Sequence, residues 1–337
     1  MLIDVIIPAY KAHDTINKAV ASVVTQKIDE RDELCLTIVN DGEEKGAYDY
    51  LKSAWYGVAG MEIRTIDREK NGGCGLTRQS GIDGTCGDCF MFLDADDVLG
   101  SPFAVRTLAK EIRAGYDIAM GMFVEETPFG TMLDHGENYV WCHGKMYARG
   151  FIDKYRFRFN ETRYNEDVGF HSAMRPFANA KYIPQVVYIW ENNSASTTRE
   201  KEDAYRFDYG WRSFIENIGW AIGEMEKRNA AEEKEEMFIA QAVARMYWDL
   251  NQSIVHFPEN AEINTKAVTD FYKNSVSGFT KRGLLPYSSL AMMYFSIRRD
   301  ENPEVIPLFT FDEYLKTLGY FNDTEGKTDG DDSTGSI

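Results

Sequence analysis

The chain has 337 residues, and its 54 Asp and Glu outnumber its 37 Lys and Arg to give a formal net charge of −17. A hydrophobic fraction of 44%, with 13% aromatic residues, is ordinary for a globular protein and excludes disorder over most of the chain. Because the net charge repels phosphate groups at long range, nucleic acids and anionic lipid surfaces are disfavoured as principal partners.

The first hundred residues alternate short apolar runs with amphipathic segments. Strands are predicted over residues 3–8, 34–39, 61–66 and 89–93, with helices around 16–24, 48–55, 76–84 and 103–112. We expect Asp14 or Thr15 to cap the first helix, and Pro102 to occupy the first position of the fourth after Ser101. Apolar runs without alternation are typical of parallel strands covered on both faces. The series therefore predicts an α/β fold with a mainly parallel sheet.

The pattern changes twice after residue 116. Residues 117–195 are irregular, with a strand predicted over 117–124, a stretch rich in glycine and aromatic residues at 139–150, and an acidic pair at Glu166 and Asp167. Beyond residue 200 apolar residues recur at steps of three and four, which predicts helices. The two stripes are Trp211, Ile215, Ile218, Ile222 and Met225, and Ile239, Val243, Met246 and Leu250. We expect domains over 1–200 and 201–321 and a disordered acidic tail over 322–337.

No apolar run approaches the roughly 20 residues that span a bilayer, and no basic leader precedes the first strand. A soluble, cytoplasmic protein is therefore expected. Five cysteines in a chain without an export signal do not predict a disulfide framework. Cys86 and Cys89 form one C-x-x-C pair, and no second pair at zinc-site spacing accompanies it.

Polar residues follow each of the four predicted strands. They are Tyr10 and Lys11, then Asn40 and Asp41, then Asn71 with its glycines, and then Asp94, Asp96 and Asp97. Ligands of open parallel sheets bind beyond the carboxyl ends of the strands, so these four groups are expected to line one crevice. Turn preference alone explains Asn40-Asp41-Gly42 equally well.

Turn preference explains the fourth group poorly. Three carboxylates within four residues repel one another in a crevice unless a cation neutralises them. Mg²⁺ and Mn²⁺ prefer oxygen ligands and are often shared with a substrate's phosphates, so the cluster predicts a metal and a phosphorylated ligand. The glycine-rich dinucleotide fingerprint is absent, because Pro8-Ala9-Tyr10 follows the first strand, and the Walker pattern is absent too. Rossmann dehydrogenases and P-loop NTPases are thereby disfavoured.

With these motifs in order, residues 1–195 resemble the family 2 glycosyltransferases of the GT-A fold. The resemblance rests on five segments: Val5–Tyr10; Ile38–Gly42; Asn71–Gly73 with Arg78; Phe92–Asp97, which fits the D-x-D signature; and Glu166-Asp167, which fits the later Glu-Asp pair. Three positions depart from the family pattern, with Lys11 for Asn, Asn40 for Asp and Glu43 for Ser. These departures bear on which nucleotide is preferred.

The resemblance implies a Rossmann-like GT-A domain with a mainly parallel central sheet and flanking helices, followed by a C-terminal helical region. It also implies roles for particular residues. The donor site is Pro8, Ala9, Tyr10, Asp41, Asn71, Gly72, Arg78, Asp94 and Ala95. Asp94 and Asp96 hold Mg²⁺ or Mn²⁺, Asp167 with Glu166 supplies the general base, and Trp141, His143 and Lys145 face the acceptor. His143 or His171 is a candidate further metal ligand.

The activity so implied is metal-dependent, inverting transfer of a sugar from a nucleotide-diphosphate donor, expected to be a UDP-sugar, to an unidentified hydroxyl on a glycan, lipid-linked or other acceptor. Related alternatives are a sugar nucleotidyltransferase, whose glycine-rich loop after the first strand is missing here, and a nucleotide-sugar-binding protein, which predicts loss of Asp96 or Asp167. A phosphoacceptor receiver domain places its acidic pair after the first strand. Glu166-Asp167 also fits the start of a helix near Val168. Homo-oligomerisation is left open.

Overall fold

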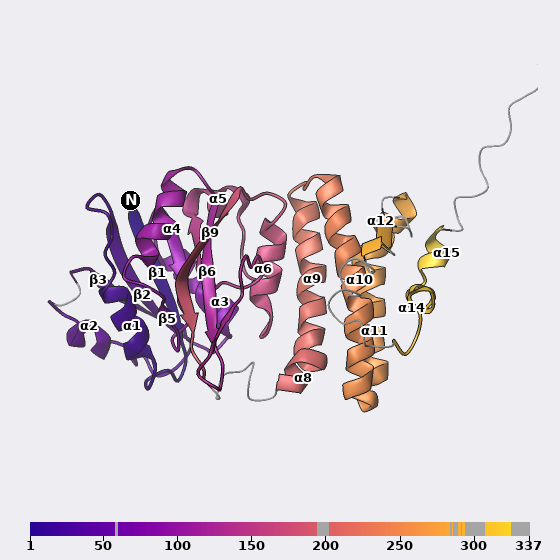
Figure 1. Ribbon diagram of the computed structural model, residues 1–337, viewed down its shortest axis with the longest axis horizontal. Coiled ribbons are helices and arrows are strands. Elements are labelled where there is room, and N and C mark those ends of the chain that lie inside the picture. The colour runs from indigo at the N-terminus through magenta and orange to yellow at the C-terminus, as the bar shows by residue number, and fades with distance from the viewer. Residues whose placement is uncertain are drawn as a thin grey trace, which may run out of the picture. The chain divides into compact units, whose positions relative to one another are not determined.

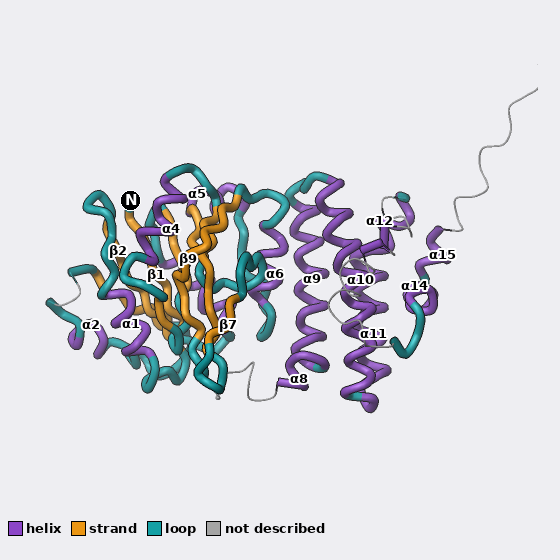
Figure 2. Tube along the Cα trace, viewed as in Figure 1, coloured by secondary structure: helices purple, strands orange, loops and turns teal. Residues whose placement is uncertain are grey.

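The computed structural model describes residues 1–57, 60–193, 202–283, 285, 289–290, 292–293 and 307–324. Its contacts divide the chain into two compact units, Met1–Glu200 and Lys201–Ile337. Strands occur in the first unit, and the described elements after residue 201 are all helical (Figure 2). The predicted domain boundaries stay a prediction. Of the predicted tail, residues 322–324 belong to a helix, and residues 325–337 lie outside the described residues.

The first unit is built on one nine-stranded sheet (Figure 1). Its strands are β1 (Leu2–Ala9), β2 (Glu33–Asn40), β3 (Glu62–Asp67), β4 (Cys89–Phe92), β5 (Val98–Leu99), β6 (Ile118–Glu126), β7 (Met132–Asp134), β8 (Lys145–Ala148) and β9 (Ala180–Trp190). The order is β3-β2-β1-β4-β8-β6-β9-β5, and β7 pairs with β6. The strands from β3 to β4 are all parallel, as the sequence predicts.

The other half of the sheet makes it mixed rather than parallel throughout. β8 runs antiparallel to both β4 and β6, whereas β9 runs parallel to β6. An antiparallel neighbour needs no helical crossover, which suits the irregular, helix-poor sequence before β8. The register of β9 against β6 slips where Gly121 pairs with Ile183 and Met122 pairs with Val186. Pro184 lies in this bulge, where the lack of an N–H group costs no ladder hydrogen bond.

Helices pack against both faces of the sheet. They are α1 (Ile16–Val24), α2 (Tyr50–Ala54), α3 (Cys74–Gly84), α4 (Ala104–Arg113), α5 (Arg149–Tyr155) and α6 (Glu166–Met174). Ile3, Val5 and Ile7 share a buried cluster with α1 and α4. Ile6 points the other way, because strand side chains alternate, and meets α3 so closely that a Cβ on Gly81 would lie 2.3 Å from the Ile6 side chain.

The start of the first helix is as predicted, whereas the start of the fourth is not. Thr15 is the N-cap of α1, yet its hydroxyl makes no capping bond and donates instead to the Ala12 carbonyl at 3.3 Å. α4 begins at Ala104, after Phe103. The prediction that Pro102 occupies the first helical position is therefore wrong. Ser101 accepts a hydrogen bond from the Phe103 N–H at 3.2 Å, and this short turn delays the helix by two residues.

The second unit is helical, and both predicted stripes are buried in it. Its elements are α8 (Glu202–Phe207), α9 (Tyr209–Lys227), α10 (Glu232–His256), the 3-10 turn Pro258–Asn260, α11 (Ala261–Phe271), the π-helical turn Tyr272–Val276, α12 (Ser277–Arg282), α14 (Phe311–Leu318) and α15 (Tyr320–Thr324). Among the described residues no helix combines the length and the hydrophobicity needed to cross a bilayer.

Candidate functional site

The four polar groups predicted at the strand ends share one edge of the sheet. β1 and β2 end in register, with Ala9 opposite Asn40, and Asn40 is opposite Asp67 at the end of β3. β4 ends at Phe92, opposite Ile6 of β1. The side chains that follow these strands therefore line the same edge, as expected for a ligand site of an α/β sheet.

Asp41, the residue after β2, is buried at this edge, and its carboxylate accepts several hydrogen bonds. It is 3% exposed and accepts hydrogen bonds from the backbone N–H groups of Gly72, at 3.0 Å, and Gly73, at 2.9 Å. The Arg68 guanidinium forms an ion pair with the same carboxylate. Gly42 follows with φ +81°, and a Cβ there would lie 2.2 Å from the Asn71 nitrogen, so the two loops can meet only around a glycine.

The loop after β1 is shaped by Lys11 and Glu43, two of the three positions that depart from the family pattern. Lys11 has φ +50°, a left-handed conformation that a lysine seldom adopts. Its N–H donates to the Glu43 carboxylate at 2.7 Å, and the Tyr48 hydroxyl donates to the same oxygen at 2.5 Å. Tyr10, beside this turn, is 45% exposed, whereas Pro8 and Ala9 are buried at the end of β1. The turn thus presents the Tyr10 ring at the open edge of the sheet.

Arg78 joins the two acidic motifs. It is 4% exposed and donates to Asp94 Oδ1 and to Glu166 Oε1, each at 2.7 Å. The resemblance placed Arg78 at the nucleoside pocket, but Arg68 is the arginine that contacts Asp41. Asn71, also expected at that pocket, is exposed, and its side-chain oxygen lies 3.4 Å from Arg163 Nη1.

The acidic loop after β4 contains a group of side chains suited to a metal ion. One ligand atom each of Asp94, Asp97 and His143 lies within 4.8 Å of the other two. Arg78 and His143 outweigh burial and lower the pKa of Asp94, which keeps its carboxylate charged. Hard carboxylate oxygens with an imidazole nitrogen fit Mn²⁺, and the carboxylates also fit Mg²⁺.

The two remaining aspartates of this loop lie in different surroundings. Asp97 is 1% exposed, and its two oxygens accept from the Tyr188 hydroxyl at 2.5 Å and from the Glu191 N–H at 2.9 Å. It therefore ties the loop to the end of β9. Asp96 is half-buried and accepts from the Asn193 amide at 2.9 Å. Burial raises the pKa of both Asp96 and Asp97.

The later acidic pair opens helix α6. Asn165, at φ +55°, is the N-cap, and both acids lie in the first turn, so the helix begins two residues before the predicted start near Val168. Glu166 is buried against Arg78, and burial together with the neighbouring Asp167 raises the pKa of Glu166 to about 7. Asp167 is half-buried, accepts from the Val168 N–H at 2.8 Å, and has its pKa raised by burial.

His171 joins helix α6 to strand β8, and both of its ring nitrogens are engaged, so neither is left for a metal. Its Nδ1 lies 2.9 Å from the Asp167 carbonyl oxygen, which can only accept, so Nδ1 carries the proton. Its Nε2 then accepts from the Tyr147 hydroxyl at 2.6 Å. Burial lowers the pKa of His171 well below its ordinary value, which keeps the ring neutral.

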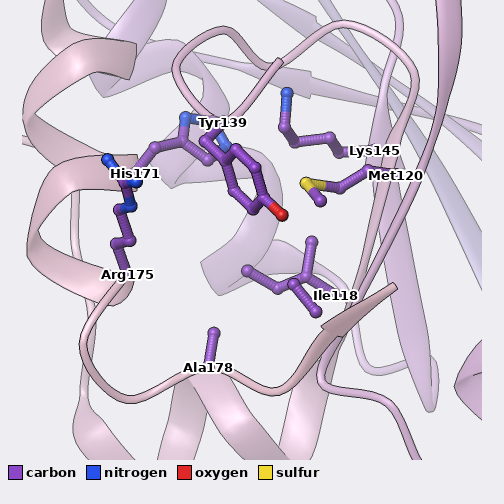
Figure 3. Close-up of a pocket in the computed structure, with 8 residues that line it drawn as sticks. Ile118, Met120, Tyr139, Lys145, His171, Arg175 and Ala178 are labelled. Atoms are coloured by element: carbon purple, nitrogen blue, oxygen red, sulfur yellow. The ribbon is translucent and has the colours of Figure 1, made fainter. Parts of the chain in front are cut away.

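A small cavity of about 50 Å³ lies beside α6 and is partly open to solvent (Figure 3). Tyr139 lies across it, between His171 and Met120, and Lys145 contributes to its wall. Lys145 is 1% exposed and donates to the Trp141 carbonyl, and burial lowers the pKa of its ammonium to about 8. Lys145 therefore lies at this cavity, whereas His143 lies at Asp94.

Aromatic rings surround His143. The His143 ring centroid is 4.8 Å from that of Tyr188, 5.4 Å from that of Trp190 and 6.0 Å from that of Trp141. These rings pack around His143, and Tyr188 among them is 1% exposed. Of the predicted acceptor residues, Trp141 and His143 are thus brought together near Asp94.

Sequence reasoning missed Arg68, Tyr188 and Trp190, and it gave Asp97 no separate role. Arg68 directly follows β3, so the strand-end argument that selected Asn71 could have found it. Tyr188 and Trp190 lie two residues apart on one strand and therefore on one face, but the irregular sequence before β9 gave no register.

Comparison with known proteins matches the chain to one family. The model of glycosyl transferase family 2 matches residues 4–182. The chain is 24% identical over 224 residues to the uncharacterized glycosyltransferase EpsJ of Bacillus subtilis, covering 58% of this chain and 63% of that protein. It is 26% identical over 127 residues to the glycosyltransferase GlyA of Streptococcus pneumoniae, covering 36% of this chain and 17% of GlyA. The chain thus spans less than two thirds of the length of these relatives.

Solved structures show the same fold. Residues 1–349 of S. aureus TarS superpose with a TM-score of 0.65 at 15% identity, covering 97% of this chain and 92% of that one. The same TarS fragment in complex with UDP-GlcNAc superposes with a TM-score of 0.67 at 15% identity, covering 96% and 92%. At this identity the likeness concerns the fold, and it includes the helical region after residue 200.

Proposed function

The chain belongs to glycosyl transferase family 2, and we propose that it transfers a sugar from a UDP-sugar to an acceptor hydroxyl, with inversion and with a divalent metal ion. The observation that carries the proposal is the convergence of three groups at one sheet edge. Asp41 is a buried carboxylate acceptor, Asp94 belongs to a metal-suited group, and Asp167 is a half-buried carboxylate at a helix start. Arg78 contacts both Asp94 and Glu166, the residue before Asp167, and so joins the last two groups.

The hydrogen bonds of Asp41 favour uracil as the base of the donor nucleotide. A carboxylate offers about four lone pairs, and three of those of Asp41 already accept from Arg68, Gly72 and Gly73. One position on Oδ2 remains, which suits the single N3–H donor of uracil. Cytosine presents an acceptor at N3, so its lone pair would face a carboxylate oxygen and bind poorly. One of the TarS structures that share this fold is a complex with UDP-GlcNAc, which agrees with a uracil base.

Asp94 and His143 are the residues we assign to the metal, because Asp94 is held charged and His143 Nε2 lies 3.4 Å from its Oδ2. Asp96 remains the ligand that the family signature implies. Both oxygens of Asp97 already accept from protein donors, so we assign Asp97 to anchoring the loop. When bound, the ion supplies Lewis-acid stabilisation of the charge on the departing diphosphate.

Asp167 is proposed to take the acceptor's proton. A carboxylate whose pKa is raised is a better proton acceptor than an ordinary aspartate, and general-base assistance contributes roughly 10²–10⁴-fold to rate. His171 holds the Asp167 carbonyl, and the N-terminal turn of α6 fixes the side chain through the Val168 N–H. Glu166 is occupied by Arg78 and is assigned to positioning rather than to proton transfer.

The donor site is tested by thermal stabilisation of the full chain with UDP, CDP and GDP, with and without Mn²⁺. We expect the largest shift with UDP and Mn²⁺ together, and Asp94→Asn to abolish the metal-dependent part. Asp153→Asn on the exposed surface of α5 serves as the matched control. Equal stabilisation by UDP with and without the ion would contradict the metal assignment, and no preference for UDP over CDP would contradict the role of Asp41.

The base is tested by release of UDP from UDP-GlcNAc with water as acceptor, since hydrolysis needs the same proton transfer. Asp167→Asn is expected to slow release at least about a hundredfold while the affinity for UDP and Mn²⁺ stays within about twofold. Unchanged release would refute the role of Asp167. Donor binding without turnover by the unmodified chain, towards water or any glycan acceptor, would favour a nucleotide-sugar-binding protein.

A further inference from the structure

The three positions at which the chain departs from the family pattern belong to one hydrogen-bond network. Lys11 follows β1, Asn40 ends β2, and Glu43 lies three residues after Asn40. β1 and β2 are parallel neighbours (Figure 1), and Ala9 pairs with Asn40, so the two segments leave the sheet side by side. The three departures therefore concern a single place in the fold.

Asn40 holds the backbone of the segment that carries Glu43. Its side-chain oxygen accepts from the Glu43 N–H at 3.0 Å, and its amide nitrogen donates to the Glu44 carbonyl at 3.1 Å and to Asp67 Oδ1 at 2.8 Å. Aspartate, the residue of the family pattern, has no N–H to donate and would place a second carboxylate against Asp67. An amide at position 40 therefore suits this chain because Asp67 faces it.

Glu43 in turn holds the loop after β1. Its Oε1 accepts from the Lys11 N–H at 2.7 Å and from the Tyr48 hydroxyl at 2.5 Å, and the Tyr48 oxygen accepts from the Ala12 N–H at 3.1 Å. Burial opposes the charged form of Glu43, yet the hydrogen bonds from Tyr48 and Lys11 lower the pKa of this carboxyl, so the acceptor is a carboxylate. A serine oxygen lies two bonds nearer the backbone and cannot replace both bonds.

This network bears on the donor site because it fixes the residue next to Tyr10. Lys11 has φ +50°, which glycine and asparagine adopt far more readily than lysine, so the bond to Glu43 compensates an unfavourable turn. A loop that is already held in its binding conformation loses less entropy when a ligand arrives. We propose, given that the chain binds a UDP-sugar, that Glu43 is a positioning residue, which holds Tyr10 where one base meets both Tyr10 and Asp41.

The test measures the Kd of UDP with Mn²⁺ and the KM for UDP-GlcNAc in the release of UDP with water as acceptor. Glu43→Ser should raise both at least about fivefold, since the hydrogen bonds that hold the turn are lost. Its kcat should stay within about twofold, because Glu43 acts on binding through Tyr10, whereas partial unfolding would lower kcat and leave KM unchanged. Glu43→Gln should raise Kd less than Glu43→Ser, because the amide oxygen can still accept from Lys11 and Tyr48.

The double variant distinguishes positioning from a general loss of structure. Asparagine adopts φ > 0 without help, so Lys11→Asn added to Glu43→Ser should restore the Kd to within about twofold of that of the unmodified chain. Lys11→Asn alone should change the Kd little. Glu44→Ser is the matched control and should leave the Kd unchanged, because Glu44 is an exposed neighbouring acid that joins the network through its backbone carbonyl.

Hydrogen exchange of the nucleotide-free chain measures the hold on the loop without any ligand. Glu43→Ser should speed exchange of the peptide that contains the Lys11 and Ala12 N–H groups. Equal Kd in the unmodified and Glu43→Ser chains, even with faster exchange, would overturn the proposal, and so would a loss that Lys11→Asn does not restore. Failure of the proposed function would instead appear as absence of UDP binding by the unmodified chain, so the two failures are distinguishable.

Discussion

Replacing Arg78 with methionine removes the cation that lies between the two acidic motifs. Arg78 is 4% exposed, and its partners Asp94 and Glu166 have side chains that are 23% and 9% exposed. Breaking a buried pair by removing one partner costs about 3–5 kcal/mol, because the remaining charge is left uncompensated. Near pH 7.5 we therefore expect Arg78→Met to lower the free energy of unfolding of the first unit by about 3–5 kcal/mol.

The expected loss depends on pH in a defined direction. The pKa of Glu166 is about 7 with Arg78 present, so near pH 5.5 Glu166 is largely protonated and has little ion pairing to lose. The cost of Arg78→Met should then fall at pH 5.5. For the same reason Glu166→Gln should reduce the cost of Arg78→Met at pH 7.5, which a double-mutant cycle measures.

Hydrogen exchange of the β1 and β4 peptides in the full chain reports the opening of the first unit separately from the second. Arg158→Met is the control, because Arg158 and its partner Asp83 have side chains that are 59% and 49% exposed. Such surface pairs contribute about 0–1 kcal/mol. A loss below about 1 kcal/mol for Arg78→Met at pH 7.5, or the same loss in the Glu166→Gln background, would refute the argument.

Three further outcomes are expected. Because the folded-state pKa of Glu166, about 7, exceeds its ordinary 4.5, the folded chain binds more protons than the unfolded chain between these pH values. The free energy of unfolding should therefore fall as pH rises from 4.5 to 7, and Glu166→Gln should make this fall smaller. An unchanged dependence of the free energy of unfolding on pH, measured by urea titrations, would contradict this. Asp96→Asn should abolish Mn²⁺-dependent UDP binding without lowering the melting temperature, whereas Asp97→Asn should lower the melting temperature of the metal-free chain; the reverse pattern would exchange their roles. Lys11→Asn should raise the free energy of unfolding by about 0.5–1 kcal/mol, since asparagine tolerates φ +50° better than lysine; a loss would contradict this.

The strand-end argument correctly placed several of the candidate side chains at one edge of the sheet, because it needs only periodicity and topology. The four parallel strands were predicted from apolar runs, and their order in the sheet brings Asp41 and the Asp94 loop to one edge without any side-chain detail. The helical unit was likewise predictable, because the stripes on α9 and α10 recur at helical spacing and are buried.

What sequence reasoning could not supply is set by contacts between distant segments. The strand-end argument could have selected Arg68, but local pattern does not say that its guanidinium pairs with Asp41 while that of Arg78 pairs with Asp94 and Glu166. The surroundings of Asp94, Asp96 and Asp97 also differ because of β9 and the residues after it, since the Tyr188 hydroxyl and the Glu191 N–H donate to Asp97. The slipped register of β9 decides which residues reach that loop, and a single sequence gives no measure of it.

Arg78 places a physical link between the donor and acceptor sides of the proposed reaction. A guanidinium is planar and presents its donors in a rigid fork, so holding Asp94 and Glu166 with two nitrogens fixes the separation of the acidic loop from the start of α6. Lysine offers one compact ammonium on a flexible stem and cannot reproduce that fork. Arg78→Lys should therefore keep the charge and most of the stability, yet slow UDP release from UDP-GlcNAc by tenfold or more while UDP affinity changes little. If turnover in Arg78→Lys equals that of the unmodified chain, the charge of Arg78 matters and the fixed separation does not.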